Sequence, residues 1–525
     1  MFKKIILLFV LSFISVSVFA QSIPSGTGRW EALGNSPFIT DPAIDLNRNP
    51  AWGNLYRNYT FGDIGRANIT DPSLYKLDKQ YAGVSFGLGP KVFAGLIVNK
   101  NEGMIFDSVF YVPNRWGMGN LSMNLPIVPL KVFIGFSPNN GKFNLAGSFY
   151  YSQKSQDSTL PVSVTQNFDT TGGILPYVIQ RVTNANYSVS KKSSVIGFNL
   201  GTILNFKDGW FEGNVDLKLN KMKYSGSKDS TATSIFRRGG TLSDSSSVDK
   251  KHLTTLDVEN DGSMEFNAFL RSCITVNKDS KVKIIPYVNI GFFSWKPKYT
   301  PTDSQNDTLP LKGFSNTTTY DNQYNYFNIN GGIGINMPVL GDGMLACGLS
   351  LGYNTYKLTS SNIQTVWTGN GITPSAFDTI KTLTTNTSDY KYTKLTLPKV
   401  NIGLEWKFTN WLTGRFGYSR AITNEKTTNT SSTSIQQYRY SVISGNNYLR
   451  NSWTVENPSN EINDQNPTDP IQTISLGLGF HFDRFSLDGL IGEKFFQKGV
   501  NLVSGQDDKE MFGVLSASYN FNLIK

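Results

Sequence analysis

The chain of 525 residues is poor in the side chains that most catalytic and metal sites use. It has only two histidines, His252 and His481, and only two cysteines, Cys273 and Cys347. Their spacing fits no zinc site, and two cysteines in so long a chain do not form a disulfide framework. We therefore expect no metal or cofactor and predict that the protein is not an enzyme. One bridge between the two cysteines, or two buried or lipid-facing thiols, both fit the sequence.

Long apolar runs are absent after residue 20. Residues 1–20 have the layout of a signal peptide, with Lys3 and Lys4 before an apolar core and a cut expected between Ala20 and Gln21. No later stretch approaches the ~20 apolar residues of a membrane helix, which excludes a helical inner-membrane protein. The sequence thus predicts an exported protein, with an uncleaved N-terminal anchor as the alternative.

Basic blocks are also absent, although the formal net charge is +10. Removing residues 1–20, which carry two lysines and no acid, leaves +8. This charge is spread along the chain, so we expect no nucleic acid partner. A basic exterior would instead suit the anionic headgroups of membrane lipids.

The most regular feature that is present is an alternation of apolar with small or polar residues. In residues 474–482, Ile, Leu, Leu, Phe and Phe alternate with Ser, Gly, Gly and His. A period of two is the period of a β-strand with one apolar face. After a secretory signal, many such strands predict an antiparallel transmembrane β-barrel whose apolar face meets outer-membrane lipid. The pattern recurs near 196–206, 211–220, 329–339, 400–408 and 515–523.

Sixteen segments read as strands, and the weakness of the first two extends the expected range to 14–16 strands. Short turns rich in Asn, Asp and Gly alternate with long polar stretches, which we interpret as extracellular loops. Seven aromatic residues lie near strand ends, where aromatic girdles are expected: Trp210, Phe211, Phe293, Trp295, Trp406, Trp411 and Tyr418. The strand segments lie near 55–65, 79–88, 91–98, 129–137, 143–154, 187–206, 210–224, 253–276, 281–295, 323–339, 343–358, 388–408, 411–427, 471–482, 484–496 and 510–523; the long polar stretches are 155–186, 225–252, 297–322, 359–388 and 428–470.

The irregular segment before the first strand contains the tripeptide Asn49-Pro50-Ala51. An Asn-Pro-Ala at this place, together with the C-terminal hairpin 474–490, resembles the FadL-like outer-membrane transport proteins and their relative PorV of the type IX secretion system. The resemblance implies that residues 21–53 form a hatch that plugs the lumen, with the tripeptide in its gate, and that residues 54–525 form the barrel. Trp52 follows the tripeptide where the family usually carries glycine. A plain turn set by Pro50 is the alternative.

Two kinds of function follow from this resemblance. A FadL-like barrel would take up hydrophobic or small molecules. A PorV-like barrel would bind secreted or surface proteins as part of a secretion system, or serve as a structural outer-membrane protein. By the alternation, six polar side chains should face the lumen, where they would pair across strands or tune passage. They are Glu212, Asp216, Lys218, Glu405, Lys407 and His481.

Overall fold

The computed structural model shows one closed antiparallel β-barrel, in which each strand pairs with its neighbours in sequence and β1 pairs with β16. It describes residues 28–66, 81–99, 130–138, 141–167, 177–237, 245–277, 281–307, 313–339, 343–370, 377–443, 446–491 and 512–521; the expected signal peptide and its cleavage site lie outside them. Every one of the sixteen expected strand segments contains a strand, which confirms the upper end of the range. The strands are β1 Tyr59–Arg66, β2 Tyr81–Gly87, β3 Val92–Asn99, β4 Leu130–Phe136, β5 Phe143–Asn167, β6 Tyr177–Phe206, β7 Gly209–Arg237, β8 Ser245–Asn277, β9 Val282–Asp307, β10 Gly313–Val339, β11 Gly343–Asn370, β12 Phe377–Lys407, β13 Leu412–Ile443, β14 Asn446–Phe482, β15 Phe485–Ile491 and β16 Phe512–Asn520.

An apolar belt surrounds the outside of the barrel near the end where the short turns lie. On β6, the alternate residues Ile196, Phe198, Leu200, Leu204 and Phe206 are between 38% and 59% exposed. The stretch 196–206 is about 33 Å long at 3.3 Å per residue, which a tilt of about 45° reduces to a height of about 23 Å. This height matches the apolar band of outer-membrane barrels, so the belt is the lipid-facing surface. No helix among the described residues is long and apolar enough to span a membrane.

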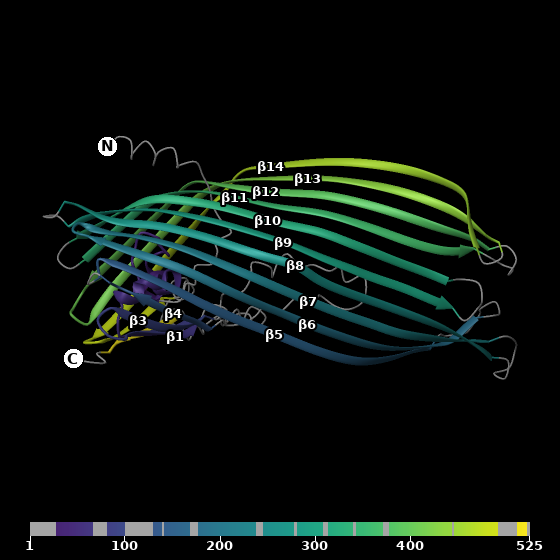
Figure 1. Cartoon of the computed structure of the whole chain (residues 1–525), viewed down its shortest axis with the longest axis horizontal. Helices are drawn as coiled ribbons and strands as arrows, with labels where there is room; N and C mark the ends of the chain where they lie inside the picture. Colours follow the sequence, from purple (N-terminus) through teal and green to yellow (C-terminus); the bar gives the residue numbers. More distant parts are fainter. Residues whose placement is uncertain are drawn as a thin grey trace, which may run out of the picture.

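Strands β5 to β14 continue far beyond the apolar belt, and Figure 1 shows them extending well past the end of the barrel where β1, β3 and β4 lie. They contain 25 to 37 residues each, whereas ~9–11 residues cross a bilayer. The five polar stretches expected as long extracellular loops are strands in all of their described residues, so that expectation was wrong. Outside the membrane a hairpin meets water on both faces, and it therefore loses the apolar alternation while Ser and Thr still support paired backbone. We call these parts of β5–β14 the strand extensions.

Three aromatic residues that were expected in the interfacial girdles face the inside of the barrel instead. Trp210 packs edge-on against Trp52 with ring centroids 5.1 Å apart, and Phe293 and Trp295 are buried. Each lies an even number of positions from the buried inner residues of its strand, and therefore on the inner face rather than on the face of the apolar belt. The expectation was wrong for these three residues because alternation along the strand, and not closeness to its end, decides which face a side chain occupies.

Between residue 28 and the first strand, the structure has three short helices: α2 Gly28–Ala32, α3 Pro42–Arg48 and η1 Pro50–Asn54. Asp41 caps α3 by accepting from the backbone N–H groups of Ala43 and Ile44, and Pro42 needs no such partner. Asn49 caps η1 in the same way, accepting from Ala51 N at 3.0 Å. Both X-Pro pairs thus begin helices. In Figure 1 these purple helices lie within the ring of strands, at one end of the barrel.

Candidate functional site

The N-terminal segment, residues 28–58, is bonded to the inner wall on several sides of the ring. Gly28 N donates to Ser516 Oγ of β16 at 2.8 Å. Asn336 of β10 donates to Phe38 O at 2.9 Å, and Asn199 of β6 donates to Arg48 O at 3.0 Å. These strands are well separated around the ring, so the segment is held from different directions.

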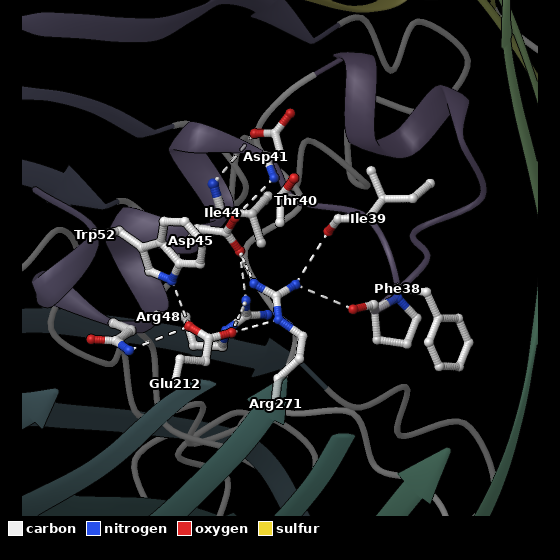
Figure 2. Close-up of polar contacts among 12 residues, drawn as sticks. Phe38, Ile39, Thr40, Asp41, Ile44, Asp45, Arg48, Trp52, Glu212 and Arg271 are labelled. Carbon is white, nitrogen blue, oxygen red and sulfur yellow. Dashed lines mark hydrogen bonds and ion pairs between the residues drawn. The ribbon is translucent and has the colours of Figure 1, made fainter. Parts of the chain in front are cut away.

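Arg271 of β8 joins the wall to this segment and is only 1% exposed. Its Nη2 donates to Asp45 Oδ1 at 2.8 Å, and its Nε donates to Glu212 of β7. Its Nη1 donates to the carbonyl oxygens of Pro37 and Ile39 at 3.2 and 3.3 Å. Figure 2 shows the guanidinium reaching between α3 and the loop that precedes it. One side chain of the wall therefore fixes both parts of the segment.

Glu212 is fully buried and gathers donors from the segment. Arg48 Nη2 donates to Oε1 at 3.2 Å, while Asn49 Nδ2 at 3.3 Å and Trp52 Nε1 donate to Oε2. Arg48 also pairs with Asp45, three residues earlier in α3. Two acids therefore meet two arginines, and the buried charges balance. We call Asp45, Arg48, Glu212 and Arg271 the arginine cluster.

Aromatic rings enclose the arginine cluster. The Arg48 guanidinium lies 4.1 Å from the centre of the Phe269 ring, and that of Arg271 lies 5.0 Å from the centre of Trp210. Trp52 stacks on Tyr56 with centroids 5.5 Å apart, and burial raises the pKa of Tyr56 well above its ordinary value. Rings of this kind attract cations and exclude water, which strengthens the ion pairs inside.

A second ion cluster, the Glu405 cluster, lies on the other side of the segment. Arg29 Nε donates to Glu405 Oε2 at 3.0 Å, and its Nη1 reaches Asp41 Oδ2 at 3.3 Å. Arg415 of β13 donates to the same Glu405 oxygen at 2.7 Å and pairs with Asp488 at 2.7 Å. Burial raises the pKa of Asp41, and the Arg29 cation opposes this shift. Ion pairs thus anchor both α2 and the start of α3.

Glycines of the wall allow the segment to come close. A Cβ atom added at Gly348 or Gly334 would lie 2.1 or 2.3 Å from the Phe38 ring. A Cβ at Gly201 would lie 1.9 Å from Asn49 Oδ1. Side chains larger than hydrogen would therefore displace the segment at these points.

The residues of the expected gate lie in this interface. Asn49 and Ala51 are fully buried, Pro50 is buried at the start of η1, and Asn49 also donates to the carbonyls of Thr202 and Gly213. Trp52, which departs from the FadL-like pattern, bonds to Glu212 and is buried. Trp52 thus gives the segment an aromatic ring and a side-chain N–H donor, neither of which a glycine side chain provides.

The six expected lumen-facing residues occupy three kinds of place. Glu212 and Glu405 each belong to one of the two ion clusters. Asp216 and Lys218 are buried farther along β7, with 3.8 Å between Lys218 Nζ and Asp216 Oδ2. His481 lies near the short turn, with Nδ1 3.0 Å from Ser486 Oγ, and Lys407 is exposed at the end of β12.

Sequence reasoning did not single out Arg271, Asp45 or Arg48. The alternation along residues 263–273 could have found Arg271, because it places this arginine on the same face as Glu265 and Asn267. Nothing local could have assigned it to Asp45, since 226 positions separate the two residues.

Cys273 and Cys347 are free thiols, and Cys273 is buried. Within the described ranges, no group of three or more His, Cys, Asp or Glu side chains is placed to hold a metal ion.

Comparison with known proteins finds similarity among solved structures only. No family model and no curated protein matches the chain. The toluene transporter TodX of P. putida is 10% identical, covers 82% of this chain and 100% of its own, and superposes with a TM-score of 0.28. A FadL homologue of Pseudomonas aeruginosa is 11% identical, covers 95% and 98%, and gives 0.22. The FrpB iron transporter of Neisseria meningitidis is 8% identical, covers 90% and 83%, and gives 0.25.

The strand pairing and the apolar belt of the chain itself identify it as a transmembrane β-barrel of the outer-membrane type.

Proposed function

We propose that the protein transports hydrophobic or small molecules across the outer membrane, and that its N-terminal segment gates the lumen at the short-turn end. The observation that carries the proposal is the attachment of this segment to separate parts of the wall by two ion clusters, a buried one on β7 and β8 and a partly buried one on β12 and β13. A barrel that serves only as a scaffold needs no such closure. The Asn49-Pro50-Ala51 resemblance to FadL-like proteins agrees with this role.

The chemistry of the attachment suits a gate. Burying ions is costly, and replacing a buried ion network by well-packed apolar side chains is often neutral or stabilising. An apolar contact would therefore hold the segment at least as firmly. Ion pairs, by contrast, can exchange partners with water or with a passing polar group when the segment moves.

Single-channel conductance in planar lipid bilayers tests the gate. We expect the wild type to stay closed for most of the recording and Arg271→Met to show longer and more frequent openings. Lys357→Ala removes an exposed ion pair of the strand extensions and is the matched control. An Arg271→Met variant that keeps the heat-modifiable gel mobility of a folded barrel and conducts like wild type would contradict the gating role.

A PorV-like interaction barrel is the second candidate, favoured by one observation. The strand extensions are long and rich in polar residues, which transport alone does not require. Purification of the intact protein from its native membrane separates the candidates. Recovery with a secretion complex and without conductance in any gate variant would favour the interaction barrel, and a structural outer-membrane role would give neither result.

A further inference from the structure

A row of amide and carboxylate side chains crosses the inner wall beyond the arginine cluster. Its members occupy directly paired positions on β6, β7, β8, β10 and β11, with Gly291 of β9 between the third and the fourth. All are buried, and each lies on the inner face of its strand, as do the wall residues that contact the N-terminal segment. We call this the amide row: Asn199, Asp216, Asn267, Asn328 and Asn354.

The amide row contains buried hydrogen-bonding atoms whose capacity is unused. Among the described residues, Asn354 Nδ2 and Asn328 Oδ1 have no hydrogen-bond partner, although the residues are 0% and 3% exposed. Asn199 Oδ1, on β6, is also buried without a hydrogen-bond partner. A buried unpaired amide atom is costly, so the unpaired donor of Asn354 and the unpaired acceptor of Asn328, at directly paired positions of β11 and β10, indicate a ligand that supplies both partners.

Aromatic rings line the wall one step farther from the N-terminal segment. Phe293, Tyr326, Tyr356 and Tyr392 occupy directly paired positions on β9 to β12. The Tyr326 hydroxyl lies 3.3 Å from Asn354 Oδ1 and accepts from Asn328 Nδ2 at 3.0 Å. The rings are therefore tied to the amide row beneath them.

A second line of rings widens this aromatic surface. Trp295 stacks on Tyr324 with centroids 5.1 Å apart, Tyr324 lies 6.3 Å from Tyr356, and Tyr356 lies 6.1 Å from Tyr390. Trp295 and Tyr324 are buried, whereas the rings of β11 and β12 are half-exposed. The exposed part of the surface is thus centred on Tyr356, and the buried Asn354 lies two positions before it on the same face of β11.

We infer that this wall binds a short oligosaccharide, with the apolar face of a sugar ring on Tyr356 and its hydroxyl groups on the amide row. A hydroxyl both donates and accepts, which matches the open donor of Asn354 and the open acceptor of Asn328. Tyrosine offers an apolar ring with a polar tip, as an amphipathic ligand needs. The inference rests on the proposed transport function and names the class of its small-molecule substrate.

A fatty acid fits the same wall less well. Its chain would cover the amide row without supplying partners, and the unpaired atoms would keep their full desolvation cost. A purely apolar substrate would therefore favour an aliphatic wall at this level, which is not what β10 and β11 provide.

Tryptophan fluorescence titration of the full-length protein tests the inference. The protein is kept in lauryldimethylamine oxide, a detergent without a sugar headgroup, and titrated separately with maltotriose, cellotriose, laurate and adenosine. We expect saturable binding of at least one trisaccharide. Tyr356→Ala should weaken it about tenfold or more, because the variant removes the ring on which the apolar face of the sugar would lie. Tyr356→Phe, which keeps the ring, should stay within about threefold.

Two further variants sharpen the result. Asn354→Leu should weaken trisaccharide binding, whereas Tyr353→Ala, on the lipid side of the same strand, should leave it unchanged. Heat-modifiable gel mobility verifies that each variant is folded. Binding of laurate or adenosine alone, or no binding of either trisaccharide, would overturn the inference. The gate would survive that outcome if Arg271→Met still opened the pore, so the two proposals fail separately.

Discussion

The two ends of this barrel place similar ion pairs in opposite surroundings. At the short-turn end, Arg271 and Asp45 meet at 2.8 Å with side chains 1% and 0% exposed. In the strand extensions, Lys357 and Asp389 meet at 3.7 Å with side chains 48% and 51% exposed. Removing one partner of a buried pair costs about 3–5 kcal/mol, whereas an exposed pair contributes about 1 kcal/mol or less. The charges that position the N-terminal segment are therefore concentrated at one end.

The outer surface differs between the ends in the same way. On β6, Leu200 is 59% exposed within the apolar belt, whereas Asn186 is exposed in the extension of the same strand. One continuous strand thus passes from lipid into water. The backbone pairing continues across this boundary, and only the outward side chains change.

The largest effect should follow from removing the centre of the arginine cluster. Arg271→Met leaves Asp45 and Glu212 buried with Arg48 alone, and we expect the free energy of unfolding to fall by about 3–5 kcal/mol. Urea unfolding in detergent, followed by tryptophan fluorescence, measures the loss. The double variant Glu212→Gln/Arg271→Met should recover part of the loss, because it leaves one buried carboxylate, Asp45, with one arginine, Arg48, and the buried charges balance again. A loss below about 1 kcal/mol would mean that the cluster does not hold the segment.

A charge on the lipid-facing surface should come next. Leu200→Arg places a cation in the middle of the apolar belt and should lower stability by about 2–4 kcal/mol, measured by unfolding from lipid vesicles. Asn186→Arg makes the same kind of change in the strand extension and should have almost no effect. Equal losses at both positions would place the membrane boundary elsewhere on β6.

A smaller effect should come from filling the space beside Phe38. Gly348→Val would collide with the Phe38 ring and should cost about 1–3 kcal/mol, while making residues 28–58 easier to cleave by protease. Phe38→Ala in the same chain should restore room for the valine. Gly147→Ala, whose Cβ would meet its nearest atom at an ordinary 3.8 Å, is the control. Protease resistance equal to wild type in Gly348→Val would contradict the close seating of the segment.

The smallest effect belongs to the exposed pair. Lys357→Ala should change stability by less than about 1 kcal/mol, and the difference should vanish in high salt because an exposed pair is screened. Unfolding at low and high ionic strength measures it. A loss comparable with that of Arg271→Met would remove the contrast between the two ends.

The strands could be predicted from the sequence wherever lipid and lumen impose opposite demands on alternate residues. Residues 196–206 and 474–482 carried that signal, and both lie in strands. Residues 428–470 did not, because water on both faces removes the alternation although the backbone is paired. Sequence reasoning consequently found each described strand but placed the outer ends of the long ones too close to the membrane, as for β6, which was expected from 187 and begins at Tyr177.

The candidate site was only partly predictable for a related reason. Parity placed Glu212 and Glu405 on the inner face, and local resemblance singled out Asn49-Pro50-Ala51. Their partners come from distant parts of the chain, as in Glu212 with Trp52, 160 positions apart. Alternation reports the face on which a side chain lies, but not the level at which two strands meet, so it cannot select partners.

The closing pair β1–β16 has a consequence for the order of assembly. The segment that precedes β1 contacts walls contributed by β6 to β8 and by β12 to β16, and Gly28 bonds to Ser516 across 488 positions. It cannot reach all of these partners until the last strand has been synthesised and exported. Contacts so distant in sequence form slowly, since a long loop must close before they stabilise anything. Residues 28–58 are therefore expected to be among the last to settle, and until then the nascent barrel needs protection from aggregation.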